Sequence, residues 1–187
     1  MKTKKSICLM VLFLLFSVIL CSADGFTFGL SHSLSDTVLE INDYGVLCKY
    51  TKNNISIEPG LAIGYNIIAD YSNYSENIGS SIIIWTIPSI SIEYQIYKFG
   101  SFDFNIINKN DFLFKTYQEE TDITRIEEIV LGVDKSISNY TGLEFGIGIA
   151  KNINIKLGLT LCLARYSIIN NSFEYFKNSM LSFKLIF

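Results

Sequence analysis

Hydrophobic residues recur at every second position through most of this chain. The clearest run extends from Ile153 to Ala164, where the odd positions hold only Ile or Leu and the even positions hold small or polar residues. The same alternation appears at 55–67 and at 143–150. Successive side chains of a β-strand point to opposite faces, so each run predicts a strand with two different faces. A helix would scatter these apolar residues around its whole circumference.

The alternation predicts eight strands in one domain. They cover residues 25–34, 37–51, 54–68, 81–97, 101–117, 129–150, 153–166 and 177–187. Three connections are tight, at 52–53, 98–100 and 151–152, and four are longer, near 35–36 and at 69–80, 118–128 and 167–176. In the tight Lys98-Phe99-Gly100 connection, the glycine is expected in the left-handed conformation of a three-residue hairpin loop. Tight and long connections alternate strictly, which is typical of an all-β, antiparallel, up-and-down barrel with turns at one end and loops at the other.

The two faces of the predicted strands differ in side-chain size. The face without large apolar residues is mainly Gly, Ala, Ser and Asn, with Gly60, Gly146 and Gly158 as examples. Small residues suit the crowded interior of an eight-stranded barrel. The Ile, Leu and Phe face is therefore expected outside, against hydrocarbon, which predicts a transmembrane barrel. A soluble periplasmic barrel of the lipocalin type, with its apolar face inside, is the alternative.

Both prolines fall inside predicted strands. Pro59 and Pro88 cannot donate a ladder hydrogen bond, and a closed barrel has no edge strand to hold them, so a bulge is predicted at each. Trp85 would fall on the small-residue face if the alternation ran on without a break. The bulge predicted at Pro88 would move Trp85 to the lipid interface.

Residues 1–23 are typical of a secretory signal peptide. Lys2, Lys4 and Lys5 precede an apolar stretch at 7–20, and small residues end at Ala23. The barrel domain is then expected at 24–187. Lipidation at Cys21, or retention of the segment as an uncleaved anchor, are the alternatives.

Composition and cysteine usage exclude several classes. The chain is 49% hydrophobic and 18% charged, with a formal net charge of −3, so it is neither a disordered chain nor a typical nucleic-acid binder. It contains no Cys/His cluster with zinc spacing, and we expect no metal and no cofactor. Cys48 is predicted on the lipid face and Cys162 in the lumen, so a disulfide between them is not expected.

The C-terminal segment ends in an aromatic residue with apolar residues at period two before it. Leu181, Phe183, Leu185 and Phe187 make up this pattern. It resembles the closing strand of bacterial outer-membrane barrels, and the strand count and loop alternation resemble the small families of the OmpX and OmpW types and the transmembrane half of OmpA. The resemblance implies secretion across the inner membrane, residence in the outer membrane, contact with membrane lipid, and recognition of Phe183, Leu185 and Phe187 by the barrel-assembly machinery.

Charged residues of both signs fall on the small-residue face. They are Lys49, Glu58, Glu93, Asp103, Glu144, Lys156 and Lys184. A lysine facing lipid near the midplane would cost about 2–4 kcal/mol, so these residues are expected inside. We predict that they form salt bridges that fill the lumen; a polar path for protons or small ions is the alternative.

Candidate chemistry outside the lumen is sparse. His32 lies between two serines, with Asp36 or Glu40 nearby in sequence, an arrangement that lipid-modifying barrels could use, but no G-x-S-x-G motif supports it. The connection at 118–128 is acidic and does not match an EF-hand loop. Aromatic residues near two other connections predict an interfacial belt or a contact surface: Tyr71, Tyr74, Phe173, Tyr175 and Phe176.

The sequence therefore predicts a non-enzymatic outer-membrane barrel with a structural or surface-interaction role through its outward loops, the surface ligand being unknown. A narrow channel for ions or small solutes is the second hypothesis. A lipid-modifying enzyme that uses His32 is the third.

Overall fold

The structure is a computed structural model that describes residues 26–35, 41–70, 79–118, 133–175 and 179–187. These residues form the strands β1 (Phe26–Ser35), β2 (Asn42–Lys52), β3 (Ile55–Asp70), β4 (Gly79–Phe99), β5 (Phe102–Gln118), β6 (Ser136–Ala150), β7 (Ile153–Ser167), β8 (Ser172–Glu174) and β9 (Ser179–Ile186). The signal peptide predicted at 1–23 lies outside the described residues. In the described part of the chain, no helix is long and apolar enough to cross a bilayer.

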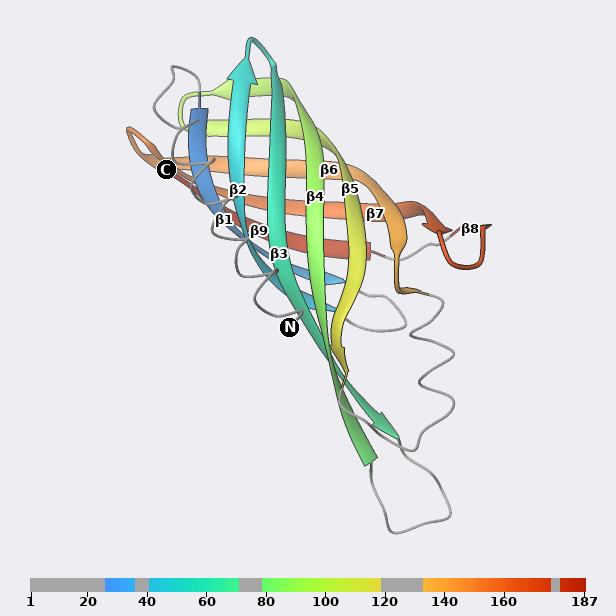
Figure 1. The fold of residues 1–187 in the computed structure, drawn as a ribbon. Coiled ribbons are helices and arrows are strands. Elements are labelled where there is room, and N and C mark those ends of the chain that lie inside the picture. The colour runs from blue at the N-terminus through green and yellow to red at the C-terminus, as the bar shows by residue number, and fades with distance from the viewer. Residues whose placement is uncertain (1–25, 36–40, 71–78, 119–132, 176–178) are drawn as a thin grey trace.

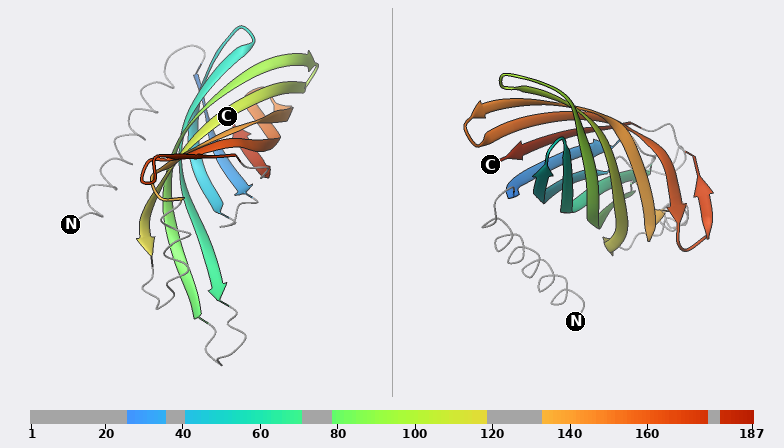
Figure 2. Two further views of the ribbon diagram at one scale, coloured as in Figure 1. Left: turned by 90° about the vertical axis from the view of Figure 1, so that its right-hand side faces the viewer. Right: turned by 90° about the horizontal axis from the view of Figure 1, so that it is seen from above.

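The strands form one antiparallel sheet that closes on itself (Figures 1 and 2). Consecutive strands pair from β1 to β7, and β9 closes the ring by pairing with both β7 and β1. The three-residue β8 pairs with the end of β7, outside the ring. The predicted all-β, up-and-down barrel is confirmed, with a ring of eight strands and one additional short strand.

Two strands begin later than predicted. The strand expected from residue 37 begins at Asn42. The strand expected from residue 129 begins at Ser136, because residues 134–135 form a turn in which Lys135 has a φ of 53°. A left-handed backbone conformation is incompatible with an extended strand.

Three tight turns lie between β2 and β3, β4 and β5, and β6 and β7. Gly100 has a φ of 57°, the left-handed conformation expected for it. Phe99 pairs directly with Phe102, so the loop has two residues and not the three predicted. Glycine at the first central position is typical of the type II′ turn, whose twist matches that of the flanking strands.

Neither proline produces the predicted bulge. Leu47 pairs with Gly60 and Tyr50 pairs with Ile57, so the register between β2 and β3 is the same on both sides of Pro59. The register between β4 and β5 is likewise constant across Pro88. Each proline has a paired residue on one neighbouring strand and none on the other. The sheet therefore loses a backbone hydrogen bond at each proline, and the side chains still alternate between the two faces.

The bulges occur elsewhere, and Trp85 is therefore inside the barrel. The β4–β5 pairing shifts at Ile96 on β4 and at Thr116 on β5. Trp85 is fully buried, its Nε1 donates a hydrogen bond to Asn66 Oδ1 at 2.9 Å, and it belongs to an internal apolar cluster with Ile41, Ala62, Ile83, Ile87, Leu113 and Val133. The expectation that Trp85 lies at the lipid interface is wrong, because alternation continues unbroken through Pro88.

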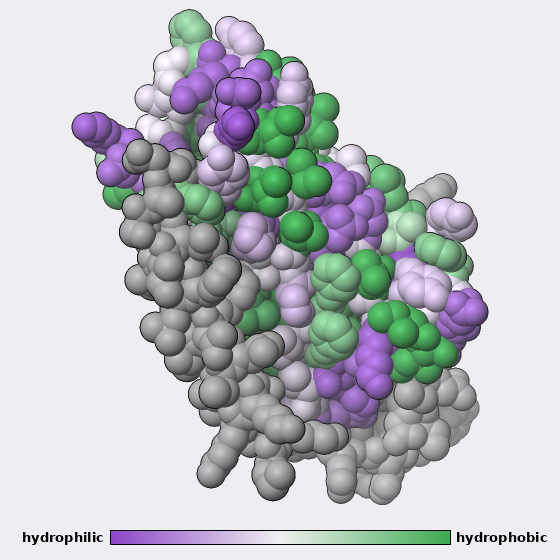
Figure 3. All heavy atoms as spheres, turned by 45° about the horizontal axis from the view of Figure 1, so that its top comes forward, coloured by the Kyte–Doolittle hydropathy of each residue, from purple (hydrophilic) through white to green (hydrophobic). Residues whose placement is uncertain are grey.

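The two faces of the ring have opposite chemistry. On β7, Leu157, Leu159 and Leu161 are 50%, 59% and 51% exposed, whereas the intervening Thr160 is buried. Hydrophobic side chains are spread over the visible exterior, with hydrophilic ones gathered at one end and in patches between them (Figure 3). The apolar face is outside and the small and polar face is inside, as the alternation predicts.

The two described cysteines lie in different strands and form no disulfide. Cys162 is buried inside with Tyr140 and Met180, as expected. Cys48 shares the alternation of the exposed Tyr44 and Tyr50, yet it is buried. Burial does not move it to the other face of β2, so its place on the outer face stays a prediction.

Candidate functional site: ion pairs inside the barrel

Six of the seven charged residues predicted for the lumen meet in one cluster, which we call the lumen network. Six different strands supply its members: Lys49 from β2, Glu58 from β3, Glu93 from β4, Glu144 from β6, Lys156 from β7 and Lys184 from β9. Each belongs to the inward-facing set of its strand, and none is more than 9% exposed. Alternation alone therefore brings together residues that are far apart in sequence.

Glu93 and Lys184 lie at the centre of the lumen network. The carboxylate of Glu93 accepts from Lys49 Nζ at 2.5 Å, Lys156 Nζ at 2.6 Å and Lys184 Nζ at 2.9 Å. Lys184 also contacts Glu58 at 2.5 Å and Glu144 at 2.8 Å. The pairs Lys49–Glu58 at 3.0 Å and Lys156–Glu144 at 2.7 Å complete the set.

Three lysines and three glutamates make the lumen network electrically neutral. Charges taken out of water need close partners to offset their desolvation, and here each ammonium group contacts at least two carboxylates. Lys156 and Lys184 are direct cross-strand partners, a repulsive arrangement that the surrounding glutamates offset.

The lumen is filled at the level of these ion pairs. A cavity of about 30 Å³ next to Glu58 and Lys184 is the space left beside them, enough for one or two water molecules. Gly158 faces the same layer, where a Cβ would collide with Ser182 Oγ. Only small residues fit between the charged side chains, as expected for so narrow a barrel.

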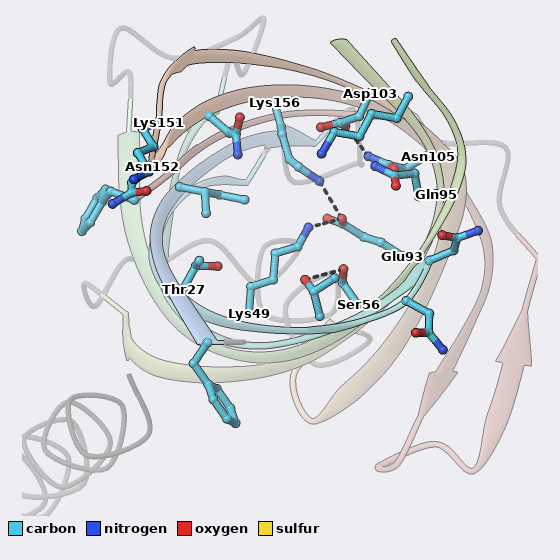
Figure 4. A pocket seen from close by; sticks show the side chains of 18 residues that line it. Thr27, Lys49, Ser56, Glu93, Gln95, Asp103, Asn105, Lys151, Asn152 and Lys156 are labelled. Carbon is cyan, nitrogen blue, oxygen red and sulfur yellow. Dashed lines mark hydrogen bonds and ion pairs between the residues drawn. The ribbon is translucent and has the colours of Figure 1, made fainter. Parts of the chain in front are cut away.

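Asp103, the seventh predicted member, lies outside the lumen network. Its Oδ1 accepts a hydrogen bond from Asn105 Nδ2 at 2.7 Å, and its carboxylate covers Gly146. Within the described ranges it forms no ion pair. Its side chain lines the turn end of the lumen, beyond Lys156 (Figure 4).

The turn end of the lumen is an open, polar vestibule. It has a volume of about 530 Å³, and Lys49, Glu93 and Lys156 lie where it meets the lumen network (Figure 4). Amide side chains from the turns and the adjoining strand ends line much of the remainder: Asn53, Asn54, Gln95, Asn105, Asn152 and Asn154. The lumen network closes the inner side of this vestibule.

A second charged layer lies on the loop side of the lumen network, and the sequence reasoning missed it. Lys109 Nζ pairs with Asp111 Oδ2 at 3.0 Å, and the buried Arg165 donates from Nε to Ser138 Oγ at 3.0 Å. The alternation that selected Asp103 also selects Lys109 and Asp111, so this signal was present. Arg165 could not be found in this way, because the β6–β7 register shifts at Leu163 and reverses the phase.

His32 lies on the outer face and stacks on Tyr44 with ring centroids 4.4 Å apart. Its Nδ1 lies 2.7 Å from the backbone oxygen of Asp43. Asp36 and Glu40, the acids proposed to accompany it, fall outside the described residues. Among those that are described, no carboxylate is hydrogen-bonded to His32, so its use in catalysis stays a hypothesis.

The structure describes only some of the residues in the other predicted surface features. Residues 119–128 of the acidic connection lie outside the described ranges, as do Tyr71, Tyr74 and Phe176. Phe173 packs against Tyr166 with centroids 4.8 Å apart, and Phe173 and Tyr175 are strongly exposed. They remain candidates for either a belt or a contact surface.

Comparison with known proteins bears on the fold. No family model matches the chain, and no curated protein matches it. The crystal structure of Neisserial surface protein A (NspA) is similar, with a TM-score of 0.51 and 11% sequence identity over 87% of this chain and 96% of that one. At this identity the similarity shows the fold alone, and it confirms the predicted resemblance to small β-barrels.

Proposed function

We propose that this chain is an integral β-barrel protein of a bacterial outer membrane. The observation that carries the proposal is the exposed apolar residue that every ring strand presents: Leu30, Tyr44, Ile63, Ile92, Ile106, Leu143, Leu159 and Leu181. Complete transfer of a large apolar side chain out of water is worth about 1.5–3 kcal/mol, and these half-exposed residues would each gain part of it. Soluble monomers rarely expose so much contiguous apolar surface. The charged residues lie inside the barrel and the apolar residues lie outside. This distribution suits a protein surrounded by lipid and not one surrounded by water.

Several further features support the outer membrane. A closed ring satisfies the backbone groups of its strands internally, as hydrocarbon requires. The signal-like segment at 1–23 and the aromatic Phe187 at the end of the closing strand have the pattern of secreted barrels, and the NspA-like fold agrees with it.

We infer that the role is structural or surface-interacting rather than catalytic or conductive. The lumen network occupies the cross-section through which a solute would pass, and breaking it would leave buried charges unpaired. Contacts with other molecules would then be made by the long connections between strands, which are expected to face outward from the cell. Planar bilayers containing the protein should show no steady conductance, and a stable open level would favour the channel hypothesis.

Spin labels on β7 test the orientation of the barrel. Labels at positions 157, 159 and 161 should be accessible to a lipid-soluble quencher, and a label at position 154, which lines the open vestibule, should not. The measurement uses single-cysteine variants reconstituted in vesicles and compares quenching by a lipid-soluble and a water-soluble agent. Lipid access at position 154, or access of the water-soluble agent to all four positions, would favour the soluble barrel.

Deletion of Phe187 should impair assembly. Phe187 extends the β1–β9 pairing, since its N–H donates to Phe28 O at 2.8 Å and its carbonyl accepts from Phe28 N at 3.0 Å. The two rings lie 6.0 Å apart. We expect a lower yield of folded, heat-modifiable protein in membranes from the deletion. Phe187→Ala keeps the backbone pairing and isolates the ring; a wild-type yield from both variants would show that Phe187 is no assembly signal.

A further inference from the structure

Four polar side chains form a patch on the outer wall of the barrel, where β5 pairs with β6. On each strand the residue between two of them points inward, since Lys109 pairs with the buried Asp111 and Tyr140 belongs to an internal cluster. Alternation therefore turns the four side chains outward, where they are half-buried. They form two direct cross-strand pairs, which we call the amide patch: Asn108 with Thr141, and Asn110 with Asn139.

Apolar side chains flank the amide patch on the neighbouring strands. The residues paired with it are Ile90 and Ile92 on β4, and Leu161 and Ala164 on β7. Ile90, Ile92 and Leu161 are exposed on the same outer face. The amide patch is therefore a polar island in a wall that is otherwise apolar at this level of the barrel.

The amide patch does not use its full hydrogen-bonding capacity internally. Asn108 Nδ2 donates to Thr141 Oγ1 at 2.7 Å, and Asn139 Nδ2 donates to Asn110 Oδ1 at 2.8 Å. The three other amide contacts within the patch are 3.3–3.4 Å long, beyond the usual range of about 2.7–3.2 Å. Hydrocarbon offers neither donors nor acceptors, and a polar group without a full partner there costs free energy. A molecule with donors and acceptors of its own is therefore favoured at the patch over an acyl chain.

We propose that the amide patch is the surface through which two copies of this chain associate side by side in the membrane. The inference rests on the proposed function, because only surrounding lipid removes the water that would otherwise compete for the amides. Two copies inserted in the same direction are related by a two-fold axis along the membrane normal, so each residue meets side chains at its own height. A carboxamide donates and accepts, and it can therefore pair with an identical group, which a charged side chain cannot do. Ile92 and Leu161 on either side would pack against the partner and exclude lipid from the contact.

The position of the amide patch favours a second copy over a lipid headgroup. Toward the tight turns, the next outward pair on the two strands is Ile106 with Leu143, and toward the long connections it is Phe112 with Ile137. Headgroups lie at the two surfaces of a bilayer, whereas this patch has apolar residues on both sides along the barrel. It also presents no charge to an anionic headgroup, because the ammonium group of Lys109 is paired inside the lumen.

Energy transfer between donor-labelled and acceptor-labelled full chains in phosphatidylcholine vesicles measures association as the protein-to-lipid ratio is varied. We expect the wild-type protein to dimerise. The double variant Asn110→Leu/Asn139→Leu should weaken the dimer about tenfold, since hydrogen bonds between membrane-embedded segments contribute modestly and the loss occurs on both copies. Asn54→Leu/Asn152→Leu is the matched control, because it makes the same two changes on exposed turn residues, and it should alter the association less than twofold.

Crosslinking locates the contact on the wall. In a Cys48→Ala/Cys162→Ala background, Leu161→Cys places a thiol beside the amide patch, and a short thiol-reactive reagent should join two copies there. Leu30→Cys is the comparison, since Leu30 is similarly exposed, at 46% against 51%, and lies on β1, across the ring from β5 and β6. It should give no crosslinked dimer.

Insertion of the same preparations into vesicles separates the two proposals. Failure of the wild-type protein to insert would overturn the proposed function. Inserted protein that stays monomeric at every protein-to-lipid ratio would overturn the dimer contact alone, as would equal crosslinking at positions 161 and 30 or equal weakening by the two double variants. An inserted monomer that retains a lipid in native mass spectrometry, when Asn110→Leu/Asn139→Leu does not, would make the amide patch a lipid site and would also contradict the inference.

Discussion

Glu93→Gln should lower the free energy of unfolding by about 3–5 kcal/mol. The Glu93 carboxylate contacts Lys49, Lys156 and Lys184, so its neutralisation leaves three buried ammonium groups around two carboxylates. The amide keeps the size of the side chain, which limits any loss of packing. Chemical unfolding in vesicles, followed by loss of the heat-modifiable band, measures the change.

Two comparisons show whether charge is the cause. Glu174→Gln makes the same chemical change on an exposed side chain of β8 and should alter stability by less than about 0.5 kcal/mol. Glu93→Gln combined with Lys156→Met restores equal numbers of lysines and glutamates. The double variant should therefore be more stable than the sum of the two single changes by about 1–3 kcal/mol. Additive losses, or a neutral Glu93→Gln, would show that the lumen network is hydrated and weakly coupled.

The architecture could be predicted because one physical rule governs most of the chain. Alternation determined the strands, the tight and long connections determined their order, and residue size distinguished inside from outside. β7 illustrates this, with its leucines outside and Lys156 inside. The failure at Trp85 came from applying a second rule too strictly: Pro88 removes a hydrogen-bond donor, but the neighbouring pairings hold the register constant.

The candidate site could be predicted as far as the alternation stayed in phase. Lys49, Glu93 and Lys184 were identified because no bulge separates them from the clear runs of their strands. Arg165 was missed because the bulge at Leu163 reverses the phase, and bulges at non-glycine residues leave no simple mark in a sequence. Which lysine contacts which glutamate depends on strand stagger around the ring, and single-strand patterns do not encode that.

Arginine at two adjacent positions of β7 should fail in two different ways. Leu159 is exposed and Gly158 is buried against Ser182. Leu159→Arg should still assemble and lose about 2–4 kcal/mol of stability in a bilayer if position 159 lies near the midplane. Gly158→Arg should yield no folded barrel, because the lumen has no space for the side chain and the lumen network has no surplus negative charge to pair with it.

The same substitution in a turn provides the control for this pair. Asn152→Arg places the guanidinium in an exposed tight turn and should leave both assembly and stability close to wild type. Heat-modifiability reports assembly, and denaturant titration in vesicles reports stability. A Leu159→Arg protein as stable as Asn152→Arg would mean that water surrounds the exterior. A folded Gly158→Arg protein would mean that the lumen is wider than the ion pairs indicate. Only a barrel with lipid outside and a filled interior predicts both losses at neighbouring positions together with tolerance in the turn.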